Sequence, residues 1–272
     1  MGSYEIGKIL RCSPSHVRNK LWELNISRSV QEAKSLIKPL HKRTDFSGNL
    51  KEKAYIIGFR LGDLHVFKRH PKSPTVIVQT NTTKEEQLVL FEQMFLKYGY
   101  IKRANRDKNG AISIRTYLNN TFKFLCPKAD KVEPWILKNN GYFMSFLAGY
   151  ADAEATFCIC GNDGVMSIKT QDKNILFAIW RKLNDMGILC KKPNMFRLKG
   201  SIDYRGIINN KDAYIFTIYR KDSLLSIIKL LEKYLKHGKR VKDMEIVKKN
   251  INDRNIKYNF KKDNRWLKTY RT

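Results

Sequence analysis

Residues 54–63 read AYIIGFRLGD and residues 145–154 read SFLAGYADAE, so two similar apolar stretches begin 91 residues apart. Each stretch has the length of a short helix and carries a small residue at every fourth position. Residues four apart lie on one helix face, and small residues on that face let two helix backbones approach closely. We therefore expect the two helices to pack against each other. The small residues are Ala54, Gly58 and Gly62 in the first stretch and Ser145, Gly149 and Ala153 in the second.

Each stretch ends in an acid, Asp63 in the first and Glu154 in the second. Packing of the helices brings the two carboxylates side by side, where they repel each other unless a proton or a cation intervenes. The simpler alternative is that both acids merely end their helices, but a negative charge at a helix C-terminus is unfavourable. Carboxylate oxygens are hard ligands that suit Mg²⁺. The pair therefore predicts a divalent metal site.

The chain of 272 residues is strongly basic, with 53 Lys and Arg against 25 Asp and Glu and a formal charge of +28. Nucleic acid is the first candidate partner of such a surface, and an anionic membrane surface is the competing one. Hydrophobic residues make up 42% of the chain, which allows a large core and argues against global disorder. No apolar run reaches the roughly 18 residues of a membrane span, so we expect no membrane partner. Paired acids in a basic protein indicate metal-dependent chemistry on phosphodiesters.

The five cysteines are odd in number and show no C-x-x-C spacing. We expect free thiols and a reducing, intracellular compartment. Cys158 and Cys160 alternate as in a strand and so share one sheet face. A zinc site there is the alternative, but no histidine stands at ligand spacing nearby.

The similarity between the two halves extends beyond the acid-tipped helices, which indicates a true internal repeat. Hydrophobic periodicity and turn residues predict the order α-β-β-α-β-β-α in each half, hence an α+β fold with two pseudo-symmetric repeats. We assign residues 46–140 to the first repeat and residues 141–250 to the second. The expected strands are 64–68, 76–81, 100–103 and 112–118, then 156–160, 165–171, 188–191 and 214–219. The expected helices that follow the acid-tipped ones are 87–98 and a short one after 120, then 174–185 and 223–235, with an insertion at about 192–212.

Strands 76–81 and 166–171 alternate between apolar and polar residues. Period-two alternation buries one face of a sheet and leaves the other with hydrogen-bonding side chains. A solvated face is the plain interpretation, but the charge of the chain favours a face that contacts nucleic acid. Side chains of the outward faces are then candidates for reading bases, because Arg and Gln suit bidentate contacts with guanine and adenine.

Residues 1–45 form a helix-turn-helix-like unit followed by a linker. Helices are expected over residues 4–10 and 13–24, with Ser13 as the N-cap and Pro14 in the first turn, and one more amphipathic helix around residues 30–38. A plain helical hairpin that packs on the main domain fits the same pattern. Residues 251–272 are expected to form a basic C-terminal tail. If the unit reads DNA, its contacts come from the start of the second helix, at Ser15, His16, Arg18 and Asn19.

Residues 58–63 and 147–154 resemble the two signature helices of LAGLIDADG homing endonucleases in their single-chain, two-repeat form. The resemblance covers about residues 50–250. The first motif departs from the family pattern, with Leu61 where the family often has Asp and Leu64 in place of the final Gly. The acid at the metal-binding position is present in both motifs.

The resemblance implies two antiparallel sheets that form a saddle over the major groove of a long DNA site. It implies a monomer that hydrolyses phosphodiesters on both strands of that site and leaves staggered ends. Two or more Mg²⁺ ions are then shared by Asp63 and Glu154, with the carbonyls of Gly62 and Ala153 as further ligands. The unlike acids and unlike sheets suggest that the target is not a perfect palindrome.

Further roles follow from the resemblance by position. Asn81 and Gln171, at the ends of the second strands, are expected to order water. A lysine after the last helix of a repeat is expected near the acids, at Lys239 in the second repeat and at Lys128 or Lys131 in the first. The side chains expected to contact bases are Phe67, Arg69, Gln79, Arg103 and Arg115 in the first half and Lys169 and Tyr219 in the second.

Two other functions remain compatible with these features. One is a non-catalytic DNA-binding regulator on the same fold, which the N-terminal unit would suit. The other is an RNA maturase that assists intron splicing through the same basic sheet surface. Both acids are present, and this favours the endonuclease.

Overall fold

The computed structural model describes residues 2–26, 41–202 and 206–258. The chain divides into two compact units, residues 1–43 and residues 44–272. Among the described residues, no helix combines the length and the apolar character needed to cross a membrane. All five cysteines are free thiols.

The N-terminal unit contains α1 (Ser3–Leu10) and α2 (Pro14–Glu23). The turn between them contains Arg11 in the left-handed conformation with φ 51°, and the Ser13 Oγ accepts the His16 N–H at 3.1 Å as the predicted N-cap. Val17 is the only large apolar side chain buried in these two helices, whereas Ile9, Leu10 and Leu24 are exposed. The helix expected around residues 30–38 lies outside the described residues.

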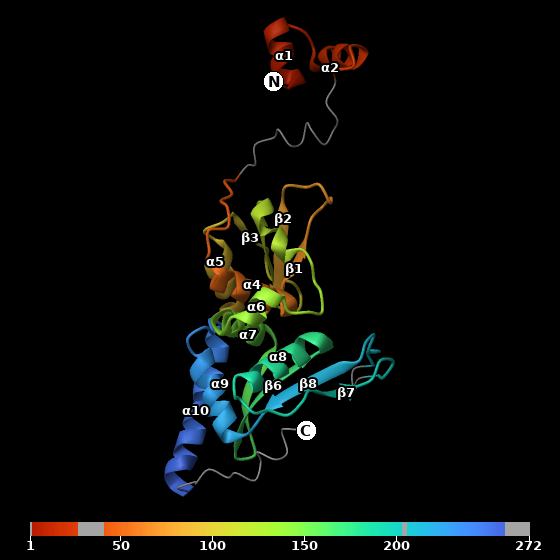
Figure 1. The fold of residues 1–272 in the computed structure, drawn as a ribbon. Coiled ribbons are helices and arrows are strands. Elements are labelled where there is room, and N and C mark those ends of the chain that lie inside the picture. The colour runs from red at the N-terminus through yellow and green to blue at the C-terminus, as the bar shows by residue number, and fades with distance from the viewer. Residues whose placement is uncertain (1, 27–40, 203–205, 259–272) are drawn as a thin grey trace. The chain divides into compact units, whose positions relative to one another are not determined.

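The main unit has the predicted order of elements in both repeats (Figure 1). The first repeat consists of α4 (Leu50–Gly62), β1 (His65–Phe67), β2 (Val76–Thr82), α5 (Glu85–Phe95), β3 (Ile101–Arg103), β4 (Ile112–Leu118), the 3-10 helix η1 (Asn120–Leu125) and α6 (Pro134–Lys138). The second consists of α7 (Asn140–Glu154), β5 (Ala155–Cys160), β6 (Asp163–Thr170), α8 (Lys173–Asp185), β7 (Asn194–Arg197), β8 (Ala213–Ile218), α9 (Lys221–Leu231) and α10 (Gly238–Tyr258).

Each repeat forms one antiparallel sheet of four strands, in the orders β1-β2-β4-β3 and β5-β6-β8-β7. The two orders are equivalent, so the predicted α+β fold with two pseudo-symmetric repeats is confirmed. In the central strand pairs, Gln79 lies opposite Arg115 and Ser167 lies opposite Thr217. Figure 1 shows α4 and α7 at the centre of the main unit, between the elements of the two repeats.

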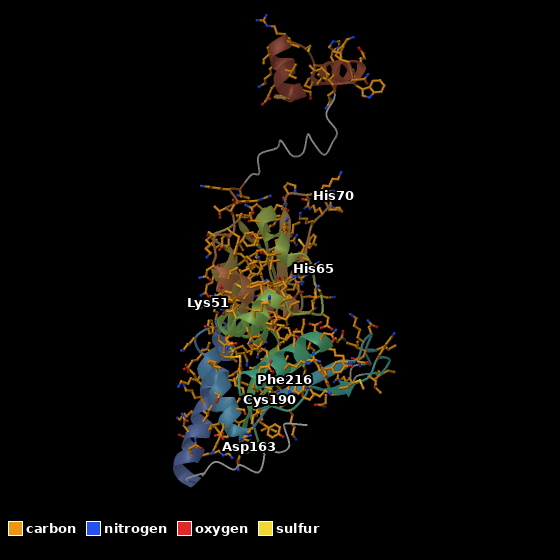
Figure 2. All side chains as sticks on the ribbon, viewed as in Figure 1. Lys51, His65, His70, Asp163, Cys190 and Phe216 are labelled. Atoms are coloured by element: carbon orange, nitrogen blue, oxygen red, sulfur yellow. The ribbon has the colours of Figure 1, made fainter. Side chains whose placement is uncertain are left out.

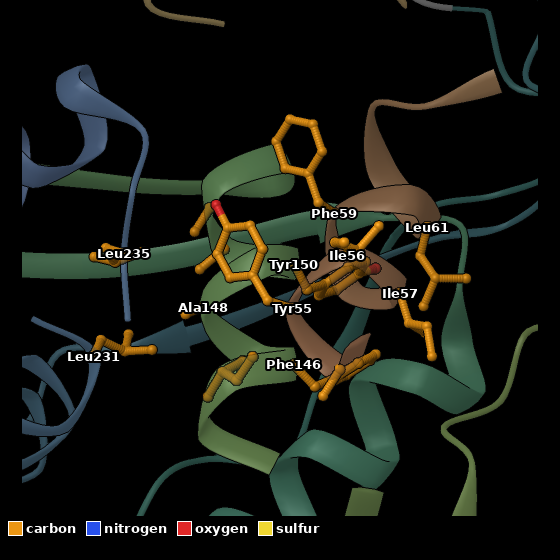
Figure 3. Close-up of a cluster of buried hydrophobic side chains, with 14 of the residues drawn as sticks. Tyr55, Ile56, Ile57, Phe59, Leu61, Phe146, Ala148, Tyr150, Leu231 and Leu235 are labelled. Atoms are coloured by element: carbon orange, nitrogen blue, oxygen red, sulfur yellow. The ribbon is translucent and has the colours of Figure 1, made fainter. Parts of the chain in front are cut away.

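The pairing of α4 with α7 fixes the relation between the repeats. The side chain of Asn49 caps α4 and that of Asn139 caps α7, each through a backbone N–H of the first turn. A Cβ on Gly58 would lie 2.1 Å from the carbonyl oxygen of Phe146, and a Cβ on Gly149 would lie 2.0 Å from that of Tyr55. The two backbones therefore touch, as predicted from the small residues, and the aromatic side chains of both helices surround the crossing (Figure 3).

One predicted strand is misplaced. Residues 188–191 do not join the sheet, and β7 occupies Asn194–Arg197 instead. Cys190 is buried against α8, where its carbonyl accepts the indole N–H of Trp180 at 3.0 Å. The apolar character of this segment serves helix packing rather than a strand.

The boundary predicted between the second repeat and a C-terminal tail at residue 251 is also displaced, because α10 runs through it. Met244, Val247 and Ile251 of α10 are buried, and α10 packs on β5 and β6. A Cβ on Gly164 of β6 would lie 2.7 Å from Cγ1 of Val247. The remainder of the expected basic tail, from residue 259, lies outside the described residues.

Candidate active site and nucleic-acid interface

The C-terminal ends of α4 and α7 bring an acid pair together. Asp63 is the C-cap of α4, and Glu154 is the last residue of α7. A Cβ on Gly62 would lie 2.5 Å from Cβ of Ala153 and 3.0 Å from Oε1 of Glu154. The carboxyl of Glu154 therefore lies in the space beside Gly62, directly before Asp63 in the chain. Only a glycine at position 62 permits this approach.

Both acids have a raised pKa. Burial raises the pKa of Asp63 to about 6, against the lowering effect of the positive charges of Arg240, Lys84 and Lys128. Burial also raises the pKa of Glu154, to about 7, and the negative charges of Asp63 and Asp172 add to this. The ionised pair is thus costly in the protein alone, and a cation between the two carboxylates would stabilise it.

The oxygen donors of this site fit a hard divalent cation. Within the described part of the chain, no cluster of three or more His, Cys, Asp or Glu side chains could hold a metal. The acid pair supplies two carboxylates, and the last carbonyls of a helix, here including those of Gly62 and Ala153, lack partners within the helix. Mg²⁺ is commonly held by one or two carboxylates while water or phosphate fills its other positions. A set of two carboxylates with backbone carbonyls suits Mg²⁺ better than Zn²⁺, which prefers nitrogen and sulfur.

The basic residues around the pair differ from the predicted ones. Lys239 makes an ion pair with Asp243 one turn further along α10, with Nζ 2.6 Å from Oδ2. Its neighbour Arg240 instead lowers the pKa of both Asp63 and Glu154, as does Lys128. Arg240 is a site residue that the sequence prediction missed. A run of basic residues does not reveal which one faces inward, because that depends on where α10 begins.

Two predicted water-ordering residues lie at strand ends as expected. Asn81 is exposed on β2, opposite Ser113, and Gln171 is exposed directly after β6. Lys131 is exposed as well. Their roles stay predictions.

The outward face of the first sheet presents a row of polar side chains across all four strands. The strand register aligns His65, Gln79, Arg115 and Lys102 in this order from β1 to β3. The side chains of Gln79, Arg115 and Lys102 make no hydrogen bond or ion pair with any other residue that the structure describes, so their side-chain donors are unused. Phe67 is half-buried in the neighbouring row, and Arg69 is exposed in the connection to β2. Figure 2 shows His65 on β1 and His70 in that same connection.

Arg103 was predicted to contact bases, and the structure places it elsewhere. It lies opposite Ile114, whose side chain is on the buried face of the sheet. Its guanidinium donates to Glu92 at 2.8 Å and to Glu85 at 3.3 Å, both on α5. The outward position on β3 belongs to Lys102. A three-residue edge strand has too little alternation to show which residue points outward.

The outward face of the second sheet has shorter side chains in its central row. One row across it contains Thr156, Ser167 and Thr217. Lys169 is exposed in the adjacent row, with its Nζ 5.9 Å from the ring of Phe196 on β7. Tyr219 is exposed directly after β8, and its ring lies 5.3 Å from Nζ of Lys191. The two sheets therefore offer different chemistry to a partner.

In the N-terminal unit, the predicted contact residues lie on the first two turns of α2. Ser15, His16, Arg18 and Asn19 are all exposed. Arg18 donates to the Ser15 Oγ at 3.0 Å, so this pair is a single polar feature of the helix surface.

A comparison with known protein families matches the second repeat in sequence. Residues 147–251 match the family model described as LAGLIDADG endonuclease. A search of curated proteins gives no match. Among solved structures, the chain is similar to the homing endonuclease I-WcaI bound to its DNA recognition sequence, at 15% identity and TM-score 0.49, over 79% of this chain and 92% of that one. It is also similar to I-GzeII in complex with its DNA target, at 14% identity and TM-score 0.48, over 79% and 94% of the two chains.

Proposed function

We propose that this chain, whose residues 147–251 match the LAGLIDADG endonuclease family model, is a site-specific, metal-dependent double-strand DNA endonuclease. It hydrolyses phosphodiesters on both strands of a long, non-palindromic target and leaves staggered ends. The observation that carries this proposal is the acid pair at the ends of α4 and α7, which Gly62 alone allows to form. One chain supplies both acids, so the protein works as a monomer. Its five free thiols fit a reducing, intracellular compartment.

Asp63 and Glu154 hold the metal together with the carbonyls of Gly62 and Ala153. A bound Mg²⁺ would neutralise charge on the phosphodiester and lower the pKa of an attacking water. Arg240 and Lys128 place positive charge beside the acids, which attracts a phosphate to the same place. Asn81 and Gln171 order water around the reacting phosphate, and Lys239 stays a candidate that would have to leave Asp243 to take part.

The outward faces of the two sheets read the DNA. Arg115 and Gln79, side by side with unused donors, suit bidentate contacts with guanine and adenine in the major groove. Thr156, Ser167 and Thr217 suit thymine methyl groups and single hydrogen bonds. Phe67, Arg69, Lys169 and Tyr219 flank these rows, and the exposed polar residues of α2 add contacts outside the central site.

Two substitutions test the proposed endonuclease activity. Asp63→Asn and Glu154→Gln each keep side-chain size but remove a metal-binding charge, so each should abolish Mg²⁺-dependent cleavage while DNA affinity in EDTA stays within about threefold. Cleavage is measured on targets selected from a randomised library. If both variants still cut DNA with metal, the proposal is wrong.

One observation favours a second function, that of a DNA-binding regulator. The N-terminal unit exposes a run of polar residues at the start of a capped helix, which is how a recognition helix meets a groove. Tight specific binding without cleavage of any library member in Mg²⁺ would support this function over the endonuclease.

A further inference from the structure

Asp152 is a buried acid that the proposed chemistry does not use. It lies two residues before Glu154 in α7 and is 1% exposed. Its Oδ2 accepts the Tyr55 hydroxyl at 2.5 Å and the backbone N–H of Lys236 at 2.8 Å. Tyr55 belongs to α4, and Lys236 lies two residues before α10. One carboxyl oxygen of α7 therefore contacts both α4 of the first repeat and the segment that leads into α10.

Lys236 also contacts Tyr55 through its side chain. The Nζ of Lys236 lies 4.3 Å from the centre of the Tyr55 ring, a cation–π distance. Lys236 is thus held by its backbone N–H and by its ammonium group at once. Figure 3 shows the ring of Tyr55 reaching from α4 to α7, with Leu235 on the neighbouring segment.

The segment held in this way leads into α10. The carbonyl of His237 accepts the N–H of Val241 at 3.0 Å, which is the first helical bond, and α10 begins at Gly238. Arg240 lies in that first turn. Its Nε is buried and has no hydrogen-bond partner among the described residues, and its positive charge lowers the pKa of both acids of the pair. Arg240 as a whole is only partly buried, so the other donors of its guanidinium suit a phosphate oxygen, since Arg binds phosphate through several donors.

The first repeat has no equivalent of this anchor. The residue that matches Asp152 in the first motif is Leu61, which is 4% exposed and apolar. Burying a carboxylate is costly unless it accepts hydrogen bonds, so an acid at this one position has a specific purpose there.

We propose that Asp152 is a positioning residue: it anchors the start of α10 and thereby sets Arg240 beside the acid pair, where the guanidinium contacts a phosphate of the DNA. This inference rests on the proposed endonuclease function. Tyr55 is the partner that orients the Asp152 carboxyl from the opposite repeat.

A double-mutant cycle tests the coupling between the two residues. The variants are Asp152→Asn, Arg240→Ala and the combination of both, and the readout is the single-turnover cleavage rate at saturating target DNA and Mg²⁺. Each single variant should slow cleavage about 10- to 100-fold, because small misplacements of a positioning group have effects of that size. The combination should be no slower than Arg240→Ala alone. Tyr55→Phe should slow cleavage in the same direction but less.

A second measurement needs no activity. Hydrogen exchange at the amides of Lys236 and the first turn of α10 should be faster in Asp152→Asn than in the wild-type protein, while exchange in α8 stays unchanged. If exchange at the Lys236 amide is the same in Asp152→Asn and in the wild-type protein, Asp152 does not anchor the start of α10. If Asp152→Asn slows cleavage by the same factor in the wild-type protein and in Arg240→Ala, the proposed link between Asp152 and Arg240 is wrong. If the wild-type protein cuts no target at all, the proposed function and the role of Arg240 in cleavage are both wrong. Hydrogen exchange still tests separately whether Asp152 anchors the start of α10.

Discussion

The carboxyl of Glu154 lies in the space that a side chain at Gly62 would fill, with its Oε1 3.0 Å and its Cγ 2.9 Å from the position of a Cβ there. Two acids from different repeats can meet only because residue 62 has no side chain. The spacing of the acid pair therefore depends on a residue that contributes no functional group of its own.

Gly62→Ala should impair cleavage more than it impairs folding. The new methyl group lies against Ala153 and Glu154, so it moves the Glu154 carboxyl, and overpacking of this kind costs about 1–3 kcal/mol. We expect a loss of cleavage rate of about 100-fold with a modest fall in melting temperature. The matched control is Gly141→Ala in the first turn of α7, at the opposite end of the helix from Glu154, where a Cβ would lie 3.2 Å from the capping Oδ1 of Asn139 and 3.4 Å from Cε of Lys51. Equal rates in both variants would contradict the prediction.

Gly58→Ala and Gly149→Ala should act on stability instead. At these positions the Cβ meets a backbone carbonyl oxygen at 2.1 Å and 2.0 Å, and a backbone gives way less easily than a side chain. The helices must separate, which we expect to cost about 3 kcal/mol or more per substitution. Urea unfolding measures this, and a loss below about 1 kcal/mol for either variant would show that the helix crossing is looser than its geometry indicates.

The sequence was sufficient for the features that follow from local periodicity. Small residues at every fourth position predicted the contact of α4 with α7, and strand 112–118 was predicted with its observed bounds. Long-range packing decided the remainder. Residues 188–191 look like a strand but pack on α8, and Arg103 turns to α5 because of its register with β4. The choice between Lys239 and Arg240 depends on the start of α10, which the buried Asp152 fixes from 84 residues away.

The stability of the metal-free protein should fall as pH rises through the titration of the acid pair. The folded-state pKa of Asp63 is about 6 and that of Glu154 is about 7, both above their ordinary values of 3.8 and 4.5. The folded protein thus holds protons that the unfolded chain has released, so the contribution of the pair to stability is full below about pH 4 and is lost as pH rises to about 7. Asp63→Asn should flatten this dependence mainly between about pH 4 and 6, as thermal unfolding at a series of pH values would show.

Mg²⁺ should reverse the effect, because it binds the ionised pair. The increase in melting temperature on adding Mg²⁺ should grow as pH rises from about 5 to 8 and should be absent in Glu154→Gln. An increase that is the same at every pH, or that persists in this variant, would place the metal elsewhere.

Arg115→Ala should relax base preference at one position of the target half that faces the first sheet. A bidentate contact discriminates by about 1–3 kcal/mol, so we expect roughly a 5- to 100-fold loss of preference there. Library selection of cleaved sites measures it position by position. Thr217→Ala on the corresponding central strand is the control. It should change preference less than about threefold in the other half, because a hydroxyl accepts from or donates to either base.

DNA affinity should fall steeply with salt, and Lys102→Ala should change that slope. Each neutralised phosphate contributes a slope of about −0.9 to the logarithm of the binding constant against the logarithm of salt concentration. Lys102 lies exposed at the edge of the first sheet with no partner among the described residues, so its charge is available to the DNA backbone.

If Lys102 contacts a phosphate, Lys102→Ala makes the slope shallower by about 1 and weakens binding to all sequences equally. If it reads a base, the slope stays nearly the same and preference changes at one position. Lys248→Ala is the comparison, since Lys248 is paired with Glu232 and should leave the slope unchanged. Affinities measured from 50 to 300 mM KCl on one selected target and on an unrelated duplex distinguish the two cases. A flat salt response of the wild-type protein would contradict nucleic-acid binding by the sheets as a whole.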